Sequence, residues 1–187
     1  WVDMEKRLLE IIYEDYLDLI ESAHYGIQES HEISDELKQE IMAKFSQPIE
    51  NVYYDDKKEI SLGDVYLMFI KDVPVYYLVY KKLDDGMYEV LKMSKYYELA
   101  SNNDLITRVN DEIFALETWN FFYLNKEEIK KSIYYGNLLE EDFKLLKDFK
   151  EGKIKELPQE KRGLTPISET SIQSKFHEKE AELVREY

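Results

Sequence analysis

The sequence contains no cysteine, which excludes disulfide bonds and thiolate metal sites. Its six glycines form no phosphate-binding loop of the G-x-G-x-x-G or Walker type. No apolar run approaches the roughly 20 residues that a membrane-spanning helix needs. These absences predict a cytoplasmic protein without membrane contact, cofactor or metal. The three histidines also lack a metal-ligand spacing: His24, His31 and His177.

Positive charge is scarce as well. Forty acidic residues against 25 basic residues give a net charge of −15, and residues 1–62 alone hold 16 acids and 6 bases. Arginine, the usual side chain for forked phosphate contacts, occurs only four times. Because a phosphate backbone attracts clustered bases, this charge opposes the binding of nucleic acid or an anionic membrane. It favours a basic protein partner instead.

Two amphipathic helices are predicted in the acidic segment, residues 1–62. Apolar residues recur at helical spacing over residues 4–23, and Gly26 offers a stop after them. Ser34 can cap a second helix that runs to about Phe45. The segment is therefore expected to form an acidic helical hairpin that extends from the main domain.

Residues 63–151 have the pattern of a β-rich core. Short segments rich in Val, Ile, Tyr and Phe alternate with turn signals, and the Asp85-Gly86 pair is typical of a hairpin. Short strands joined by tight turns predict an antiparallel sheet, either a small SH3-like barrel or a bent sheet. The predicted strands are Asp64–Ile70, Val75–Lys82, Met87–Met93, Leu105–Val109 and Ile113–Leu124.

Two helices are predicted to close this core. Asn125 can cap the first, which Gly136 ends, and Leu138–Phe149 forms the second. Residues 152–187 are expected to be a linker or an extended wrap over the core, followed by a terminal helix at Lys175–Glu186. The predicted fold class is therefore α+β, with an N-terminal helical hairpin and C-terminal helices around a small antiparallel sheet.

Three side chains in the predicted strands are weak candidates for catalysis. Glu117 lies in a mostly apolar strand. There it either faces a barrel opening with a raised pKa or lies on an exposed edge, and we favour the edge. Arg108 beside Thr107 could hold a phosphate group. We favour the alternative, a rim arginine that pairs with one of the many acids.

Three apolar side chains are candidates for partner binding. Phe176 and Leu183 lie on the narrow apolar stripe of the terminal helix, which is too small to hold an isolated helix in water. We therefore expect this helix to dock on its own barrel or on a second copy of the chain. Trp119 lies where aromatic alternation is densest and is expected to pack against a helix.

Three motifs follow one another in residues 63–151: Gly63-Asp64-Val65 before the first strand, Glu117-Thr118-Trp119-Asn120 before a short helix, and Gly136-Asn137-Leu138-Leu139-Glu140-Glu141 before the last core helix. Their order resembles the PemK/MazF family of toxin–antitoxin toxins. The resemblance covers residues 63–151. It implies an SH3-like barrel and, as activity, the metal-independent cleavage of single-stranded RNA. The family's arginine is absent from Lys71-Asp72-Val73-Pro74, so no catalytic residue is carried across.

Three functions follow from these observations. We favour a non-enzymatic protein-binding or regulatory module, which acts on a protein partner or through self-association. A toxin-like endoribonuclease that acts on single-stranded RNA is the first alternative. The second alternative is an acidic protein that mimics nucleic acid and blocks a basic partner.

Overall fold

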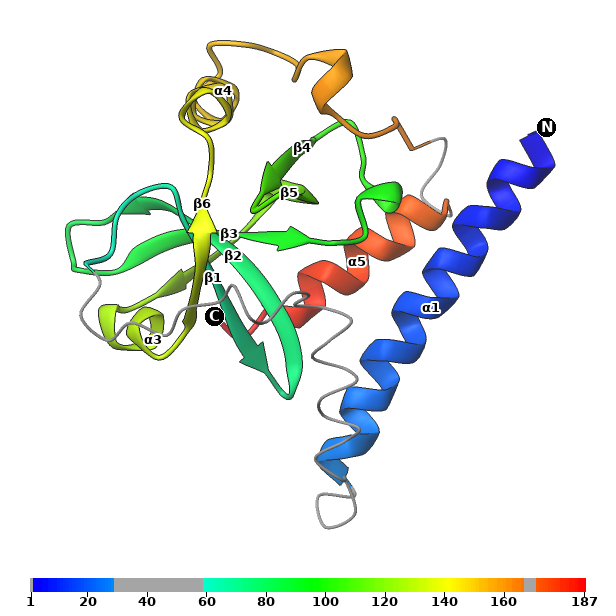
Figure 1. Cartoon of the computed structure of the whole chain (residues 1–187), viewed down its shortest axis with the longest axis horizontal. Helices are drawn as coiled ribbons and strands as arrows, with labels where there is room; N and C mark the ends of the chain where they lie inside the picture. Colours follow the sequence, from blue (N-terminus) through cyan, green and yellow to red (C-terminus); the bar gives the residue numbers. More distant parts are fainter. Residues whose placement is uncertain (1, 29–58, 167–170) are drawn as a thin grey trace.

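In a computed structural model, the chain forms an α+β fold built on one curled antiparallel sheet (Figure 1). The structure describes residues 2–28, 59–166 and 171–187. The predicted second helix of the N-terminal hairpin, Ser34–Phe45, lies outside these residues. The helices are α1 (Val2–Gln28), α3 (Lys126–Lys130), α4 (Glu140–Lys150) and α5 (Ile172–Leu183), with short 3₁₀ turns η2 (Tyr97–Leu99) and η3 (Gln159–Lys161). The strands are β1 (Asp64–Ile70), β2 (Val73–Lys82), β3 (Tyr88–Ser94), β4 (Asp104–Val109), β5 (Glu112–Leu124) and β6 (Ile133–Asn137).

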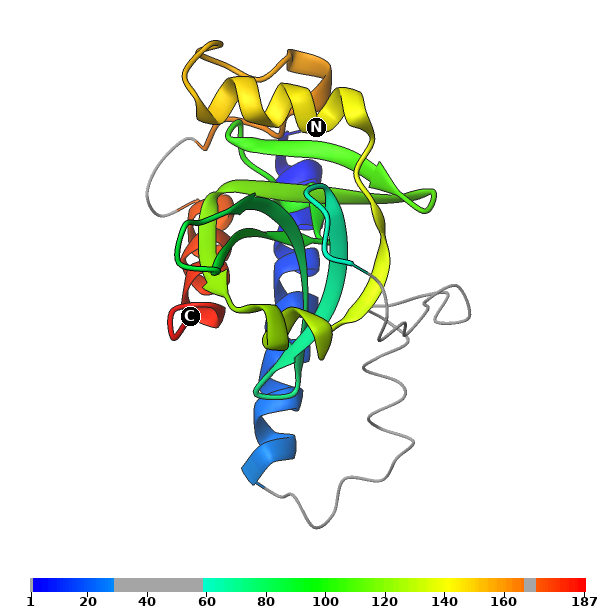
Figure 2. The ribbon, with the colours of Figure 1, turned by 90° about the vertical axis from the view of Figure 1, so that its left-hand side faces the viewer.

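The six strands follow the order β4-β5-β3-β2-β1-β6, and every neighbouring pair is antiparallel. Register shifts interrupt the β1–β6, β2–β3 and β3–β5 pairings, and such irregularities increase the twist of a sheet. The sheet curls so far that the β4–β5 turn approaches β6 (Figure 2). There the side-chain amide of Asn110 donates to the main-chain carbonyl of Tyr135. The sheet is therefore a half-barrel, which confirms the bent-sheet form of the prediction.

The hairpins that the sequence indicates are present, with one turn shorter than expected. The predicted pairing of Val75–Lys82 with Met87–Met93 is confirmed by β2 and β3. Lys71 and Asp72 have φ values of 51° and 64°, the backbone of a two-residue type I′ turn. Because this turn needs only two residues, Pro74 falls within β2, at an end of the strand that β3 does not pair.

A sixth strand was missed, because residues 125–136 were predicted as one helix. The Asn125 cap is correct, since its side chain accepts from the Glu128 amide, but α3 ends at Lys130 and β6 begins at Ile133. Gly136 is part of this strand rather than a helix end. A Cβ atom there would lie 3.0 Å from the side chains of Val109 and Asn110. Glycine therefore allows the close approach of β6 to the β4–β5 turn.

The helix boundaries also differ from the predictions. Helix α1 continues through Gly26 to Gln28, since one glycine within a helix costs only about 1 kcal/mol. Helix α5 begins at Ile172, not Lys175, because Ser171 is the residue whose side chain caps it. It ends at Leu183 rather than Glu186.

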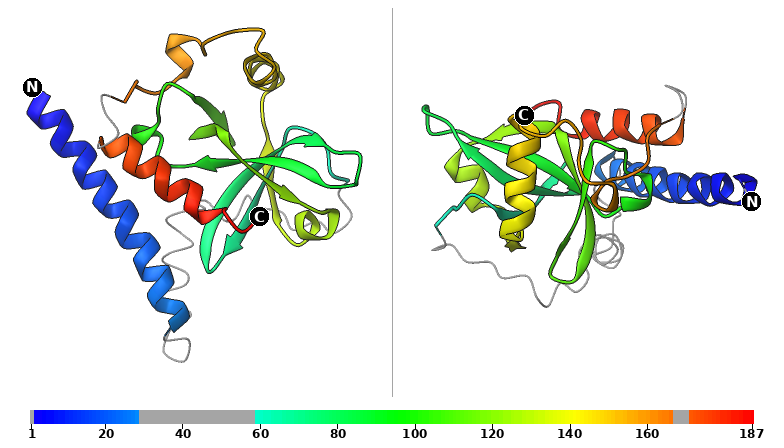
Figure 3. Two further views of the ribbon diagram at one scale, coloured as in Figure 1. Left: turned by 180° about the vertical axis from the view of Figure 1, so that it is seen from behind. Right: turned by 90° about the horizontal axis from the view of Figure 1, so that it is seen from above.

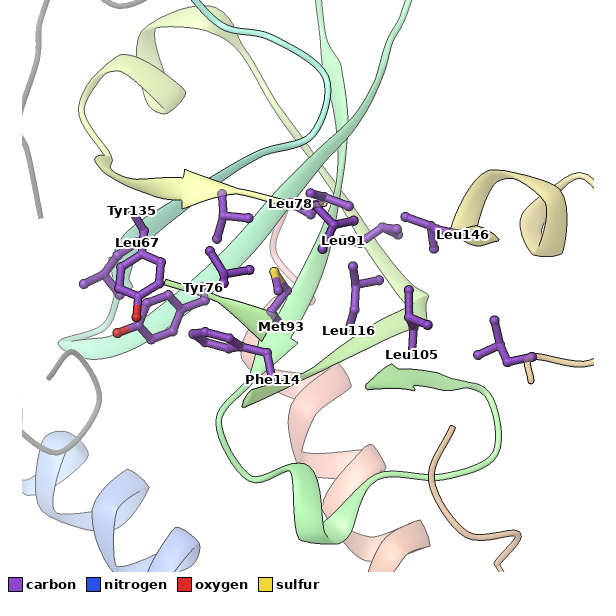
Figure 4. Packing of buried hydrophobic residues seen from close by; sticks show 14 of the residues in the cluster. Leu67, Tyr76, Leu78, Leu91, Met93, Leu105, Phe114, Leu116, Tyr135 and Leu146 are labelled. Atoms are coloured by element: carbon purple, nitrogen blue, oxygen red, sulfur yellow. The ribbon is translucent and has the colours of Figure 1, made fainter. Parts of the chain in front are cut away.

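Both faces of the sheet are apolar and covered. One face packs Leu78, Leu91 and Leu116 towards Leu146 of α4 (Figure 4). The other face contains Tyr77, Val79 and Phe122 and contacts Ile129 of α3. Neighbouring side chains alternate between the faces wherever the register is regular, so that Tyr76 and Tyr77 belong to different clusters.

The segment after α4 wraps over the core, one of the two forms that the sequence predicts. Leu157 is buried against the core, and Leu164 and Arg162 form isolated bridges with the β4 region. A Cβ atom on Gly163 would lie 2.2 Å from the carbonyl oxygen of Ala100. The wrap therefore depends on close backbone contact along the β4 edge.

Helix α5 lies between α1 and the sheet (Figure 3). Its side chains meet α1 and η2 in a third apolar cluster, which contains Tyr16, Leu99 and Phe176. The terminal helix therefore docks within its own chain, one of the two outcomes expected from its narrow apolar stripe. Helix α5 therefore covers the part of the sheet formed by β3 and β5, and α1 packs on α5 and β2. We refer to the two helices together as the helical layer.

Candidate functional site

The three candidate catalytic side chains do not share a site. The Thr107 hydroxyl is buried and donates to Oδ2 of Asp142 on α4, at 2.6 Å. Glu117 is paired across the sheet with Asp104, which lies three residues before Thr107 on β4. Since side chains alternate along a strand, Glu117 and Thr107 point to opposite faces. Arg108 is exposed at the rim.

The expectation that Glu117 lies on an exposed edge is wrong. Its side chain is fully buried, because α5 covers this part of β5 and directs Glu180 towards it. Helix α5 is more than 50 residues further along the chain. The local sequence around Glu117 therefore contains no sign of its burial.

A charged pair joins α5 to the sheet. The ammonium of Lys92 on β3 donates to Oε1 of Glu180 at 2.5 Å, and both side chains are almost completely buried. The hydroxyl of Tyr16 on α1 donates to the other oxygen of the same carboxylate, at 2.6 Å. One buried carboxylate therefore connects a strand and two helices.

Each charge keeps its partner ionised. Burial alone would lower the pKa of Lys92, but the charge of the Glu180 carboxylate and the hydrogen bond to it raise it. Burial would likewise raise the pKa of Glu180, but the Lys92 ammonium and the hydrogen bonds to the carboxylate lower it. The pair is therefore a true ion pair, held in a place where an unpaired charge would be strongly disfavoured.

Glu117 is the third member of this cluster and behaves differently. Burial, followed by repulsion from Glu180, raises its pKa well above the ordinary value. Asn120 donates to Oε1 of Glu117 at 3.0 Å, whereas Oε2 accepts no hydrogen bond from any described residue. A protonated Glu117 can donate to Glu180, and this hydrogen bond further raises its pKa. Burial and the neighbouring Glu180 carboxylate thus favour the protonated form of Glu117 beside the ion pair.

A second polar junction lies along α5, one turn before Glu180. Oδ1 of Asp104 accepts from the indole N–H of Trp119, and Oδ2 lies 2.7 Å from Nε2 of His177. Asp104 is completely buried, and its Oδ2 also accepts from the main-chain N–H of Ser101. The indole of Trp119 packs edge-on against His177, which confirms the expected contact of Trp119 with a helix.

The buried cluster is closed to substrates. The cavity beside Lys92 and Glu180 measures only about 10 Å³. It is lined by side chains of α1, β2, β3 and α5, so those elements would have to separate before a small molecule could reach the charges. The cluster can therefore fix the helices on the sheet, but it cannot perform chemistry on a substrate while they are seated.

An open groove of about 480 Å³ lies on the surface between α1 and the end of β3. Ile11 and Ile12 of α1 give it an apolar portion, and Tyr96 lies opposite. Its acidic side chains are Glu14, Asp15, Asp18 and Glu98, and its one basic side chain is Lys95. We refer to this hollow as the acidic groove.

The candidate partner-binding side chains are at the α5 contact rather than on the outer surface. Phe176 is fully buried, with its ring 4.6 Å from that of Tyr16. Trp119 and Leu183 are half-buried. As the chain is folded, Phe176 is not open to a partner, whereas parts of Trp119 and Leu183 are.

Comparison with known proteins gives no family for the chain. No family model matches it, and neither does any curated protein. The resemblance of residues 63–151 to the PemK/MazF toxins therefore stays a prediction. Within the described ranges, no three His, Asp or Glu side chains gather in a way that could hold a metal, and no helix is long and apolar enough to cross a membrane.

Glu117 was singled out in the sequence, whereas the other members of the buried cluster, Lys92, Glu180 and Tyr16, were not, although two signals were present. Lys92 lies between the apolar Leu91 and Met93 in β3, and Glu180 lies four residues after Phe176 on the buried stripe of α5. A charge at a core-facing position of each element suggests that the two charges meet. Tyr16 gave no such signal, because a tyrosine on an apolar helix face is ordinary.

The ion pair predicts strong coupling between its two members. Lys92→Met or Glu180→Gln alone should each cost about 3–5 kcal/mol of unfolding free energy, because either change leaves the other group buried without its partner. The double variant should cost clearly less than the sum of the two. Urea unfolding of the four proteins measures this.

The exposed pair of Glu151 and Lys153 provides the matched control. The corresponding cycle, Glu151→Gln with Lys153→Met, should show a coupling of less than about 1 kcal/mol. Additive effects at Lys92 and Glu180 would contradict the account of the buried pair.

Glu117 predicts a characteristic pH dependence. Its pKa is raised on folding, so its contribution to stability is fully present below its unfolded pKa and is lost as pH rises through the folded value. Glu117→Gln cannot ionise and avoids this loss. Its stability relative to wild type should therefore increase by on the order of 1 kcal/mol or more between pH 5 and pH 8. Denaturant unfolding at several pH values checks this.

Replacement of an exposed glutamate, Glu160→Gln, controls for the removal of one negative charge. A stability difference between wild type and Glu117→Gln that stays constant with pH would show that Glu117 is not held neutral.

Proposed function

We propose that the protein is a non-enzymatic binding module that takes a basic, partly apolar segment of a protein partner in the acidic groove. The observation that carries this proposal is the combination of apolar and acidic side chains in one open hollow. Such a combination suits an amphipathic peptide, whose apolar side chains enter the groove while its charges meet the walls.

The apolar portion extends beyond the groove along α1. Ile11 is 55% exposed, and Leu8, one turn earlier on the same helix, is 57% exposed. Large aliphatic side chains that remain exposed next to one another on a helix are a common feature of protein-binding surfaces. A helix or extended peptide laid along α1 would cover both.

The charge of the groove selects a basic partner. The groove is lined by four acidic side chains and one lysine, and that lysine, Lys95, pairs with Glu112 at 2.7 Å. The net charge of −15 acts in the same direction over a longer range and would increase the rate of encounter with a basic partner. A cytoplasmic location is part of the proposal, and the absence of cysteine supports it.

The two alternative functions gain less from the structure. The candidate residues for ribonuclease activity, Arg108, Thr107 and Glu117, do not meet in one place. An acidic mimic of nucleic acid would use the same negative surface, but it would not need the exposed Leu8 and Ile11. The apolar part of the groove therefore favours a protein ligand recognised by shape as well as by charge.

Charge reversal within the groove tests the proposal. Glu14→Lys with Asp18→Lys changes two exposed groove residues, and Glu127→Lys with Glu160→Lys makes the same change in net charge elsewhere. The probe is a fluorescent synthetic amphipathic helix of leucine and lysine, titrated by anisotropy at about 50 mM salt. The groove variant should bind about tenfold or more weakly than wild type, and the control variant within about threefold.

An equal loss in both variants would mean that the peptide senses only the overall charge, which would contradict a specific groove. Ile11→Ser provides the second arm, because it removes apolar contact without changing charge. If it leaves the affinity unchanged, the acidic-mimic alternative explains the surface better than a protein-binding groove does.

A further inference from the structure

The surface under α5 is unusually polar for a contact between a helix and a sheet. Lys92, Asp104, Glu117 and Asn120 all face α5 and are each no more than 5% exposed. Of the 12 residues of α5, only two are buried, and one of these is the glutamate Glu180. The rest of the sheet is covered mainly by apolar clusters, with the Thr107–Asp142 hydrogen bond to α4 as a polar contact among them. We refer to these four sheet residues, together with Tyr16, as the seat of α5. The seat is more polar than the rest of the covered sheet surface.

The seat holds α5 by contacts that are typical of ligand recognition. Lys92 and Tyr16 each donate to one oxygen of the Glu180 carboxylate, at 2.5 Å and 2.6 Å. Asn120 donates to the main-chain carbonyl of Glu180, at 3.1 Å. Side chains from β3, α1 and β5 thus bind the carboxylate and the main-chain carbonyl of one residue. Such contacts select a residue type at one helix position.

An aromatic pocket lies one helical turn away. Phe176 precedes Glu180 by four residues, so both point in the same direction from α5. The ring of Phe176 packs beside the buried Leu99 and against two tyrosine rings. The distance between ring centroids is 4.6 Å to Tyr16 and 6.3 Å to Tyr96. The seat therefore recognises two anchors, an aromatic ring and a carboxylate, at positions i and i+4 of a helix.

A polar contact of this kind can open at lower cost than an apolar one. When two apolar faces separate, both expose surface to water, whereas charged and amide groups regain hydration. Contacts within a chain that open and close are accordingly more polar than permanent cores. Phe176, Leu183 and Val184 supply most of the apolar contact of this segment, and Leu183 is only half-buried.

We propose that the seat of α5 is a binding site for an acidic amphipathic helix, with an aromatic residue four positions before a glutamate, and that α5 is its resident occupant. An outside helix of this type, presented by a protein partner, would displace α5 and take over the contacts with Lys92, Tyr16 and Asn120. This site differs from the acidic groove, although Tyr96 borders both, and it takes a carboxylate at Lys92 rather than a basic side chain. It does not depend on the function proposed above.

A labelled synthetic peptide with the sequence of residues 171–187 is the probe. In the wild-type chain the tethered α5 competes at an effective concentration that can reach the millimolar range, so the peptide should bind weakly. In the full chain, the substitution Phe176→Ala weakens the binding of the tethered α5 but leaves the residues of the seat unchanged. This variant should therefore bind the peptide about tenfold or more tightly than wild type does.

A second peptide carries glutamine at position 180. If the seat selects the carboxylate, this peptide should bind the Phe176→Ala chain about tenfold or more weakly than the first peptide. The indole N–H resonance of Trp119 reports whether the seat is occupied, because the indole donates to Asp104 on β4 and packs against His177 on α5. It should shift in the variant and return when the first peptide is added.

If circular dichroism shows that the Phe176→Ala chain does not fold, the full chain with Glu180→Gln serves as the recipient, since its seat is also unchanged. Equal affinity for the two peptides would overturn the proposal, as would a folded recipient that binds neither. The first result would show that the seat does not select the carboxylate, and the second would make α5 a fixed part of the core.

Discussion

The hydrogen-bonded ion pair between Lys92 and Glu180 is the interaction on which the helical layer of this protein depends. Removing each charge from water costs several kcal/mol, so the two are tolerated only because each satisfies the other. Tyr16 adds a hydrogen bond to the same carboxylate and thereby attaches α1. One wall of the acidic groove is α1, so the geometry of the proposed binding surface follows from a contact buried on its other side.

The pair also fixes how α5 lies on the sheet. An apolar helix can rotate or slide on an apolar surface with little loss, whereas a buried carboxylate must meet its lysine. Phe176 then fills the aromatic pocket one turn away, and His177 reaches Asp104. Glu117 contributes as a neutral acid, because its pKa is raised by burial and by repulsion from Glu180. The layer is thus held by a few directional contacts, in contrast to the apolar packing of the rest of the core.

The sheet could largely be predicted because its signals are local. Period-two alternation gives the strands, Asp85-Gly86 marks the β2–β3 hairpin and Asn125 caps α3. Strand β6 was missed because it is only five residues long, Ile133–Asn137, and its partner β1 lies far away in the sequence. The burial of Glu117 was missed for the same reason, since only the return of α5 removes it from water. Both features, the strand β6 and the burial of Glu117, depend on contacts between distant segments, which a local sequence pattern does not predict.

Amide hydrogen exchange of the Glu180→Gln chain tests most directly whether this one contact holds the helical layer. The account predicts that the amides of α5 and of α1 near Tyr16 lose protection together, while those of β1, β2 and β3 keep the protection of the wild type. If α1 remained as protected as in the wild type while α5 opened, or if the sheet opened together with both helices, the Lys92–Glu180 pair would not be the contact that joins them.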